Sequence, residues 1–164
     1  MIDALRFREA MSRLGAAVNV ITTDGPAGRS GFTASAVCSV TDSPPTLLVC
    51  MNRSSRSYPA FAENKVLCVN TLMPAHQELS RVFSSKTDMN VRFAAATWSS
   101  LHTSSPVLVG ASVAFDCSIT DISEVGSHGI FYCTVLDVYL GPQRSGLIYM
   151  NRTYHDLVVE ADTV

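Results

Sequence analysis

The sequence predicts a mainly β fold: a closed antiparallel β-barrel with a few short helices added to it. In residues 113–120, larger apolar side chains alternate with small or polar ones, as in a strand with one buried face. Clusters of Gly, Pro, Asp and Ser recur at close spacing between short apolar runs, which is typical of turns between strands. Such strands bury their apolar faces most simply by closing into a barrel.

The first half of the chain is expected to combine one helix with a hairpin and a buried strand. Residues at helical spacing predict an amphipathic helix over residues 5–16: Phe7, Ala10, Met11 and Leu14. A turn cluster at 24–28 should join strands 18–22 and 29–37 into a hairpin. After a break at 42–45, the continuous apolar run 46–51 predicts a strand that is buried on both faces.

The second half is expected to contain two more helices and the longest strands. We predict a helix over 58–64, a strand over 66–72, and a helix that opens at Pro74 and runs to about Phe83. Residues 84–90 are polar and aperiodic, which favours a loop. The final strands are expected at 113–120, 130–140 and 147–150, with a turn at 126–129. About seven strands and three short helices then form one domain over residues 1–164.

Composition narrows the class of protein. Of 164 residues, 47% are hydrophobic and 16% are charged, so the chain can bury a core and is too apolar to be disordered. So few charges favour a surface covered by a second copy, and we expect a homodimer. A net charge of −2 gives no basic excess for nucleic acid. With no apolar run of signal-peptide or membrane-span length, we expect a cytoplasmic protein without a membrane partner.

Several common catalytic and metal-binding patterns are missing from the sequence. There is no G-x-G-x-x-G, no P-loop and no G-x-S-x-G, which disfavours Rossmann, P-loop and α/β-hydrolase sites. The four histidines lack ligand spacing, so we expect no metal site. The five cysteines are widely spaced and odd in number, which favours buried thiols in a reducing compartment: Cys38, Cys50, Cys68, Cys117 and Cys133.

Four polar segments could hold a ligand, and each has a purely structural alternative. Residues 31–39 offer small side chains and hydroxyls to a ligand, or form a barrel strand at a tight bend. Residues 52–57 precede a helix and could bind phosphate, or form a solvated loop with a helix cap. Residues 126–129 place a His in a turn, where it is commonly a surface residue. Residues 152–155 could wall a planar ligand or anchor the tail.

Six motifs in order make residues 7–157 resemble the flavin reductase family with the FMN-binding split-barrel fold. They are FREAM (7–11), AVNVITT (17–23), GFTASAVCSV (31–40), PPTLLVC (44–50), CVNTL (68–72) and VGSH (125–128). The chain is similar to two subgroups: the reductases of pyrimidine (uracil) catabolism and the reductase components of two-component aromatic hydroxylases. The turn at 23–29 and the motif RFAAA (92–96) favour the first.

The resemblance implies a homodimer with FMN or FAD at or near the subunit interface. It implies contacts to the flavin ring and ribityl chain from Thr33, Ala34, Ser35, Ala36 and Ser39. It implies that the phosphate end lies near Asn52, Arg53, Ser54, Ser55 and Arg56, and near Phe83 and Ser84. His128 is implied beside the nicotinamide, as the catalytic residue, with Arg152 and Tyr154 close to the ring or to the partner subunit.

The activity that the resemblance implies is hydride transfer from NADH to an exchangeable flavin, which then leaves for a partner monooxygenase. The protein would supply orientation and charge stabilisation while the cofactor supplies the chemistry. NADH is favoured over NADPH because no Arg pair can be assigned to a 2′-phosphate. The alternatives are a flavin-binding protein without turnover and a split-barrel protein for another cofactor, such as heme.

Overall fold

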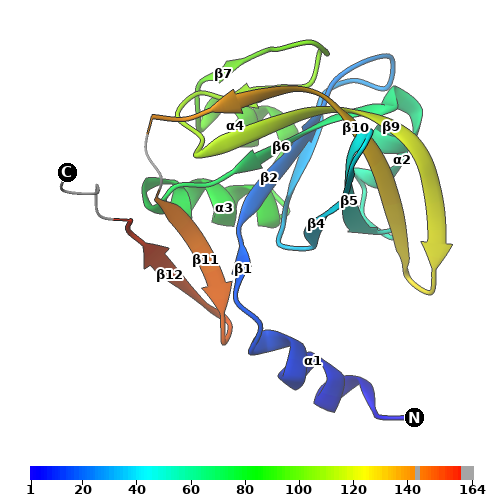
Figure 1. Ribbon diagram of the computed structural model, residues 1–164, viewed down its shortest axis with the longest axis vertical. Helices are drawn as coiled ribbons and strands as arrows, with labels where there is room; N and C mark the ends of the chain where they lie inside the picture. Colours follow the sequence, from blue (N-terminus) through cyan, green and yellow to red (C-terminus); the bar gives the residue numbers. More distant parts are fainter. Residues whose placement is uncertain (143–144, 160–164) are drawn as a thin grey trace.

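A large antiparallel sheet forms the body of the protein (Figure 1). The computed structural model describes residues 1–142 and 145–159. The seven-stranded sheet has the order β3-β2-β6-β9-β10-β5-β4. Its strands are β2 (Asn19–Thr23), β3 (Ser30–Ala34), β4 (Val37–Asp42), β5 (Pro45–Asn52), β6 (Val66–Thr71), β9 (Val113–Val125) and β10 (His128–Leu140).

Two small sheets and a few short helices complete the described chain. One sheet has the order β1-β11-β12 and the other pairs β7 with β8. The strand bounds are β1 (Ala16–Ala17), β7 (Trp98–Ser99), β8 (Val107–Leu108), β11 (Gly146–Met150) and β12 (Thr153–Leu157). The helices are α1 (Ala4–Ser12), α2 (Tyr58–Asn64), a 3-10 turn (Pro74–His76), α3 (Gln77–Ser84) and α4 (Met89–Ala94).

The large sheet is strongly curled, and a two-residue link connects its two edge strands. Its edge strands, β3 and β4, are separated in the chain only by Ser35 and Ala36. At this corner the carbonyl of Ala36 accepts from the backbone N–H of Cys50 in β5, at 3.0 Å. The predicted mainly β, antiparallel class with few helices is therefore confirmed. Within the described residues, no ladder of backbone hydrogen bonds joins β3 to β4. The predicted closure of the barrel is therefore not confirmed.

The small β1-β11-β12 sheet is fastened to the large sheet at one point. The backbone N–H of Val18 donates to Leu147, that of Leu147 to Leu72, and that of Leu72 to Val18, at 2.9 to 3.0 Å. All three side chains are buried. This triangle holds the β11–β12 hairpin beside β2, and so beside the neighbouring strand β3.

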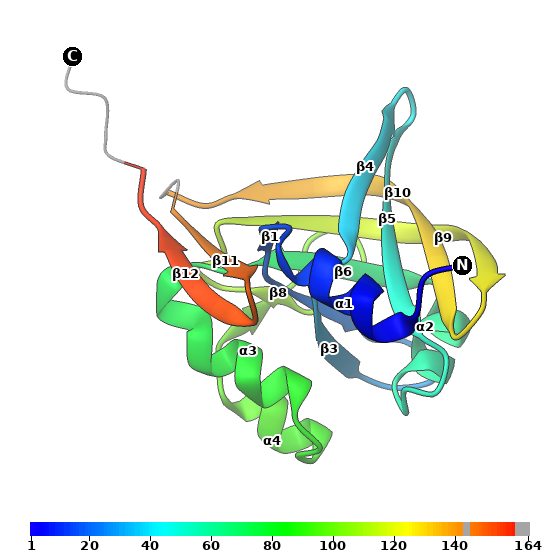
Figure 2. The same cartoon turned by 90° about the horizontal axis from the view of Figure 1, so that it is seen from below.

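Apolar side chains gather on both faces of the curled sheet. The interior holds a cluster built around Phe61, Phe131 and Val49. A second cluster, with Phe83 and Phe93 at its centre, lies between the sheet and the helices α3 and α4. Figure 2 shows α3 and α4 together on one side of the molecule, with the β4–β5 hairpin projecting away from them. The helices are therefore anchored by aromatic packing on the outer face.

Several predicted elements need correction. The expected strand 29–37 breaks at Ser35 and Ala36, because the chain passes there from one sheet edge to the other. The strand at 46–51 is not buried on both faces: Leu47, Val49 and Met51 are buried, but the residues between them are not. The segment 84–90 is not wholly a loop, because α4 begins at Met89.

The cysteines are partly as expected. All five are free thiols, and Cys68, Cys117 and Cys133 are buried, which confirms their prediction as small core residues. Cys50 is only half-buried and Cys38 is exposed, so the expectation is wrong for Cys38. The reason is that Cys38 lies on the outer edge strand β4, most of whose residues face solvent.

Candidate functional site

Two adjoining pockets lie along strand β3. The first, which we call the β3–α3 pocket, has a volume of about 530 Å³ and lies between β3, α3 and the β11–β12 hairpin. The second, which we call the cationic pocket, has a volume of about 360 Å³ and lies between β3, the end of α3 and the segment before α2. Both are lined by Thr33 and Ser84, so the two pockets meet at these residues.

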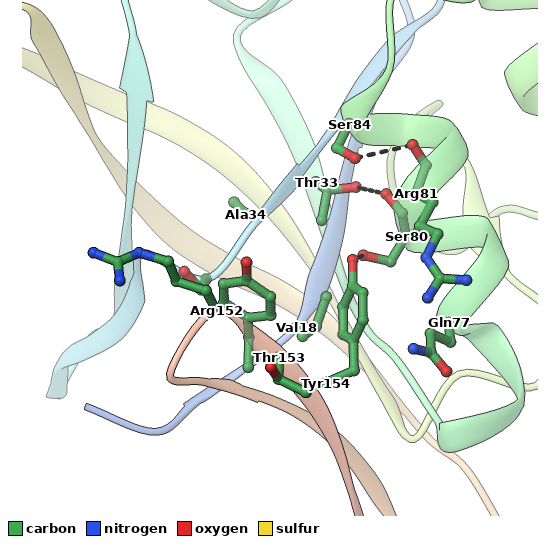
Figure 3. Close-up of a pocket in the computed structure, with 12 residues that line it drawn as sticks. Val18, Thr33, Ala34, Gln77, Ser80, Arg81, Ser84, Arg152, Thr153 and Tyr154 are labelled. Carbon is green, nitrogen blue, oxygen red and sulfur yellow. Dashed lines mark hydrogen bonds between the residues drawn. The ribbon is translucent and has the colours of Figure 1, made fainter. Parts of the chain in front are cut away.

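A hydrogen-bonded group fixes one wall of the β3–α3 pocket (Figure 3). Ser80 of α3 is fully buried, and its hydroxyl bonds the phenol of Tyr154 at 2.8 Å. The hydroxyl of Thr33 donates to the carbonyl of Ser80 at 2.7 Å. The ring of Tyr154 also packs edge-on against Tyr149, and the Arg81 guanidinium lies 5.6 Å from its centre. Strand β3, helix α3 and strand β12 are thereby held in one arrangement with an aromatic wall.

The position of α3 against β3 depends on close packing at Gly31. A Cβ atom there would lie 2.8 Å from the Phe83 ring and 3.1 Å from the carbonyl of Ile21. Only a glycine lets α3 approach β3 this closely. Phe83 in turn packs edge-on against Phe93 and Trp98, with ring centres 5.2 and 5.6 Å apart. The end of α3 is therefore fixed where it lines the cationic pocket.

The cationic pocket has the chemistry of an anion site. Arg56, Lys86 and Arg92 line it, together with the hydroxyl residues Ser54, Ser55, Ser57, Ser84 and Ser85. None of the described residues in its lining carries a carboxylate. Burial lowers the pKa of the Arg92 guanidinium and the nearby charge of Arg56 lowers it further, whereas Asp88 acts in the opposite direction. Neighbouring cations among serine hydroxyls favour a bound phosphate.

Most of the predicted cofactor-binding residues come together in these two pockets. The β3–α3 pocket contains Thr33, Ala34, Ser35, Ser84, Arg152 and Tyr154. The cationic pocket contains Thr33, Ser54, Ser55, Arg56, Phe83 and Ser84. Segments from four distant parts of the chain thus share one continuous surface.

Two further predicted residues, Ala36 and Ser39, lie beyond the β3–α3 pocket. Ala36 is at the corner between β3 and β4 and is exposed. Ser39 lines a separate apolar groove of about 540 Å³, which we call the β4 groove, and this groove shares Ser35 with the β3–α3 pocket. Contact of Ala36 and Ser39 with a flavin remains a prediction.

His128 lies at the tip of the β9–β10 hairpin, and Asn52 and Arg53 lie beside it at the end of β5. All three are outside the linings of both pockets. His128 is exposed and pairs with Asn52 across the ladder. The Asn52 side chain accepts from the backbone N–H and hydroxyl of Ser54, at 2.9 and 2.8 Å. Since Ser54 lines the cationic pocket, His128 lies on that side of the site, and its catalytic role remains a prediction.

The positive charge of Arg53 is already compensated. Its guanidinium pairs with Glu124 at 2.9 Å and also donates to the carbonyl of Gly126 at 3.3 Å. These contacts tie the end of β5 to the β9–β10 turn. Arg56, which has no such ion pair among the described residues, is the better placed cation for a phosphate.

Residue-level reasoning missed Lys86, Arg92 and Ser80. Lys86 falls in the polar segment 84–90, whose pattern predicts a loop, and Arg92 belongs to a motif that distinguishes only the subgroups. Ser80 lies inside a helix, where a serine carries no signal of its own. Only the packing of α3 and α4 against β3 brings these three residues to the site.

The described part of the chain shows neither a metal site nor a membrane-spanning helix. Among residues 1–142 and 145–159, no group of three or more His, Cys, Asp or Glu side chains is arranged to hold a metal ion. No helix in this part of the chain has both the length and the apolar character required to cross a membrane.

Comparison with known proteins identifies the family. The family model described as "Flavin reductase like domain" matches residues 11–158. The chain belongs to this family. The predicted resemblance is thereby confirmed, and the flavin reductase-like domain covers all the strands and helices described above except most of α1.

Individual relatives agree with this assignment. The flavin reductase-like chain is 59% identical over 157 residues to a Serratia proteamaculans (strain 568) protein named FMN reductase (NADH) RutF, covering 96% of this chain and 90% of the relative. A solved structure from Haemophilus somnus 129PT matches with a TM-score of 0.92 at 47% identity, covering 94% of this chain and 99% of that one. The nitrilotriacetate monooxygenase component B homolog of Mycobacterium thermoresistibile matches with a TM-score of 0.87 at 25% identity, covering 98% and 88%.

Proposed function

We propose that this protein is an NADH-dependent flavin reductase. The observation that carries the proposal is the pair of pockets that meet at Thr33 and Ser84, one with an aromatic wall and one with three cations. A flavin mononucleotide has a planar ring at one end and a phosphate at the other, and the two pockets match that sequence of groups. Membership of the flavin reductase-like family and the name of the 59% identical relative support the same activity.

The residues present fit a bound flavin. We place the ring in the β3–α3 pocket, where Tyr154 and the small residues Ala34 and Ser35 leave room for a planar group. We place the phosphate in the cationic pocket near Arg56 and Lys86. The opposite placement is disfavoured because a phosphate gains most from the pocket with the larger number of cationic side chains, and the β3–α3 pocket has two, Arg81 and Arg152, against three.

The chain's part in the reaction is to bind and orient the flavin and NADH, and to exclude water. A bound flavin would supply the hydride-accepting chemistry, with NADH as the donor. The backbone N–H groups of Val37 and Cys50 donate to the carbonyls of Ser35 and Ala36, at 3.0 Å each, and so hold the corner between β3 and β4 in shape beside the pocket. His128 is proposed to orient the nicotinamide, since hydride transfer itself needs no acid or base at that position.

The test is a steady-state assay with excess free flavin. We expect continuous NADH oxidation that depends on added FMN, FAD or riboflavin, with many turnovers for each protein molecule. Flavin binding without turnover would instead identify a flavin-binding protein, and failure to bind any flavin would point to another cofactor. Either result would overturn the proposal.

We further propose that reduced flavin passes to a separate monooxygenase. A structural relative is described as a monooxygenase component, and the open cleft along β3 lets a product leave. We therefore expect flavin to exchange freely, and gel filtration of flavin-loaded protein should remove much of its colour. Flavin that stays attached after denaturation would contradict this. The pathway, pyrimidine or aromatic-compound breakdown, remains a prediction.

The remaining parts of the proposal concern assembly and architecture. We propose a single domain whose sheet acts as a closed barrel, supported by the two-residue link between the edge strands β3 and β4. A homodimer is supported by α1, none of whose residues is buried in the single chain. Action in the cytoplasm is supported by five free cysteines, since thiols persist in reducing compartments.

A further inference from the structure

Arg92 in α4 makes an unusual set of contacts with the backbone. Its Nε donates to the carbonyl of Thr87 at 2.9 Å, and Nη2 donates to that of Ser85 at 2.6 Å. Nη1 donates to the carbonyls of Gly31 and Phe83, at 3.2 and 3.1 Å. A guanidinium has five N–H donors. Four of them are thus committed to the protein's own backbone.

These contacts converge on the segment between α3 and α4. They join that segment to the end of α3 and to strand β3, and Arg92 therefore helps to determine where Ser85 and Lys86 lie beyond the helix end. Inside the segment, the hydroxyl of Ser85 also accepts a hydrogen bond from the backbone N–H of Thr87, at 3.1 Å. The segment is exposed, so without Arg92 few buried contacts would hold it.

The same segment supplies part of the cationic pocket. Ser84, Ser85 and Lys86 line it together with Ser54, Ser55 and Arg56, which come from a distant part of the chain. A phosphate bound there would be contacted from both segments only if both are held at the correct spacing. A displacement of about 1 Å is enough to weaken charge-assisted hydrogen bonds strongly.

Resting on the proposed function, we infer that Arg92 is a positioning residue for the phosphate end of the flavin. It holds the Ser84–Lys86 segment against the pocket, and it thereby favours a flavin that carries a phosphate over one that lacks it. Its guanidinium acts through the carbonyls that it binds rather than as the main ligand of the phosphate. Lys86 and Arg56 supply the charge that meets the phosphate.

The fork of the guanidinium is essential to this role. A lysine at position 92 keeps the positive charge but has only three donors on one nitrogen, so it cannot reach carbonyls on three separate segments. Arg92→Lys therefore separates positioning from charge. Lys86→Gln is the matched comparison, because it removes a charge from the same pocket while leaving the Arg92 contacts in place.

The experiment is a titration of wild type, Arg92→Lys and Lys86→Gln with FMN and with riboflavin, at low and high salt. We expect Arg92→Lys to weaken FMN binding about tenfold or more, at both salt concentrations, with little change for riboflavin. Lys86→Gln should also weaken FMN binding, but that loss should shrink at high salt, because the charge of an exposed side chain is screened.

Amide hydrogen exchange supplies a second measurement on the folded variants. Residues 84–87 should exchange faster in Arg92→Lys than in wild type, while the β9 and β10 amides should not change. Equal weakening of FMN and riboflavin, or unchanged FMN binding in Arg92→Lys, would overturn the inference. If wild type binds neither flavin, the proposed function itself has failed, whatever the variants show.

Discussion

Thr33 and Ser84 stand where the two pockets meet, and their hydroxyls are already committed to the protein. That of Thr33 donates to the carbonyl of Ser80 at 2.7 Å, and that of Ser84 donates to the carbonyl of Arg81 at 2.9 Å. A hydroxyl has a single proton to donate but two lone pairs. Toward a ligand both oxygens therefore act as acceptors, which suits the hydroxyls of a ribityl chain better than a phosphate.

His128 lines neither pocket, and its proposed role rests on the reaction with NADH. It is exposed at the hairpin tip, where its Nδ1 lies 2.9 Å from the hydroxyl of Ser127. We expect His128→Ala to fold normally and to leave flavin affinity nearly unchanged. It should lower kcat/KM for NADH by roughly ten- to a thousandfold, the effect of losing one orienting contact.

Flavin titration and stopped-flow reduction of the same His128→Ala preparation provide the measurement. Ser127→Ala is a suitable comparison, because it removes only the neighbouring hydroxyl. Lost flavin binding with an intact hydride step would move His128 to the flavin side of the site. No change in either quantity would leave it as an ordinary surface residue of a turn.

At the scale of elements, the 3-10 turn before α3 contains a titratable contact. The Nδ1 of His76 accepts from the backbone N–H of Met73 at 3.1 Å, which requires an unprotonated nitrogen. Burial lowers the pKa of His76 below its ordinary value of 6.5. The unfolded chain therefore binds this proton more readily than the folded protein does.

This difference predicts how stability depends on pH. The contribution of His76 is fully present above its unfolded pKa of 6.5 and is lost as the pH falls below that value toward the lower folded pKa. We expect Tm to fall between about pH 7 and pH 5, and His76→Gln to reduce that dependence, because a glutamine can accept the same backbone N–H without titrating. Thermal unfolding of both proteins across this range measures the effect. An equally steep dependence in His76→Gln would assign it to other groups.

At the scale of the whole molecule, α1 is an arm that extends from the body (Figure 1). None of its residues is buried in the single chain. Leu5, Phe7 and Leu14 keep more than half of their surface exposed, at 74%, 53% and 61%. The helix is attached at its end by the backbone N–H of Asn151, which donates to the carbonyl of Ser12 at 2.6 Å, and by the Glu9–Arg152 ion pair at 3.0 Å. Such a helix gains stability from a second copy that covers it.

We therefore expect a dimer that depends on α1. Leu5→Ser combined with Phe7→Ser should shift the protein from dimer to monomer at micromolar concentration, because less apolar surface is then removed from water on association. Arg6→Ser, on the same helix, is the control and should remain dimeric. Sedimentation velocity measures the outcome. A wild-type protein that sediments as a monomer would remove α1 from the assembly.

Much of the strand and helix pattern could be predicted because it depends on local periodicity. The helix Tyr58–Asn64 was predicted with its correct bounds, and the long β9–β10 hairpin was found from alternation and its turn. The helix α4 was missed because it has only six residues, and the strand β12 was missed because its sequence is mostly polar. Their presence depends on pairing with β11 and on packing of Phe93 against Phe83 and Trp98.

By itself the sequence determined the mainly β class, the family through its ordered motifs, and ten of the residues that line the two pockets. These features depend on the spacing of residues that are close together in the chain, and such spacing can be recognised without knowledge of the fold. The tertiary structure alone decided that the strand predicted at 29–37 turns a corner at Ser35, that Arg53 is paired with Glu124, and that Arg92 organises the Ser84–Lys86 segment. Each of these depends on contacts between residues far apart in the chain, and no local pattern of side chains records such contacts.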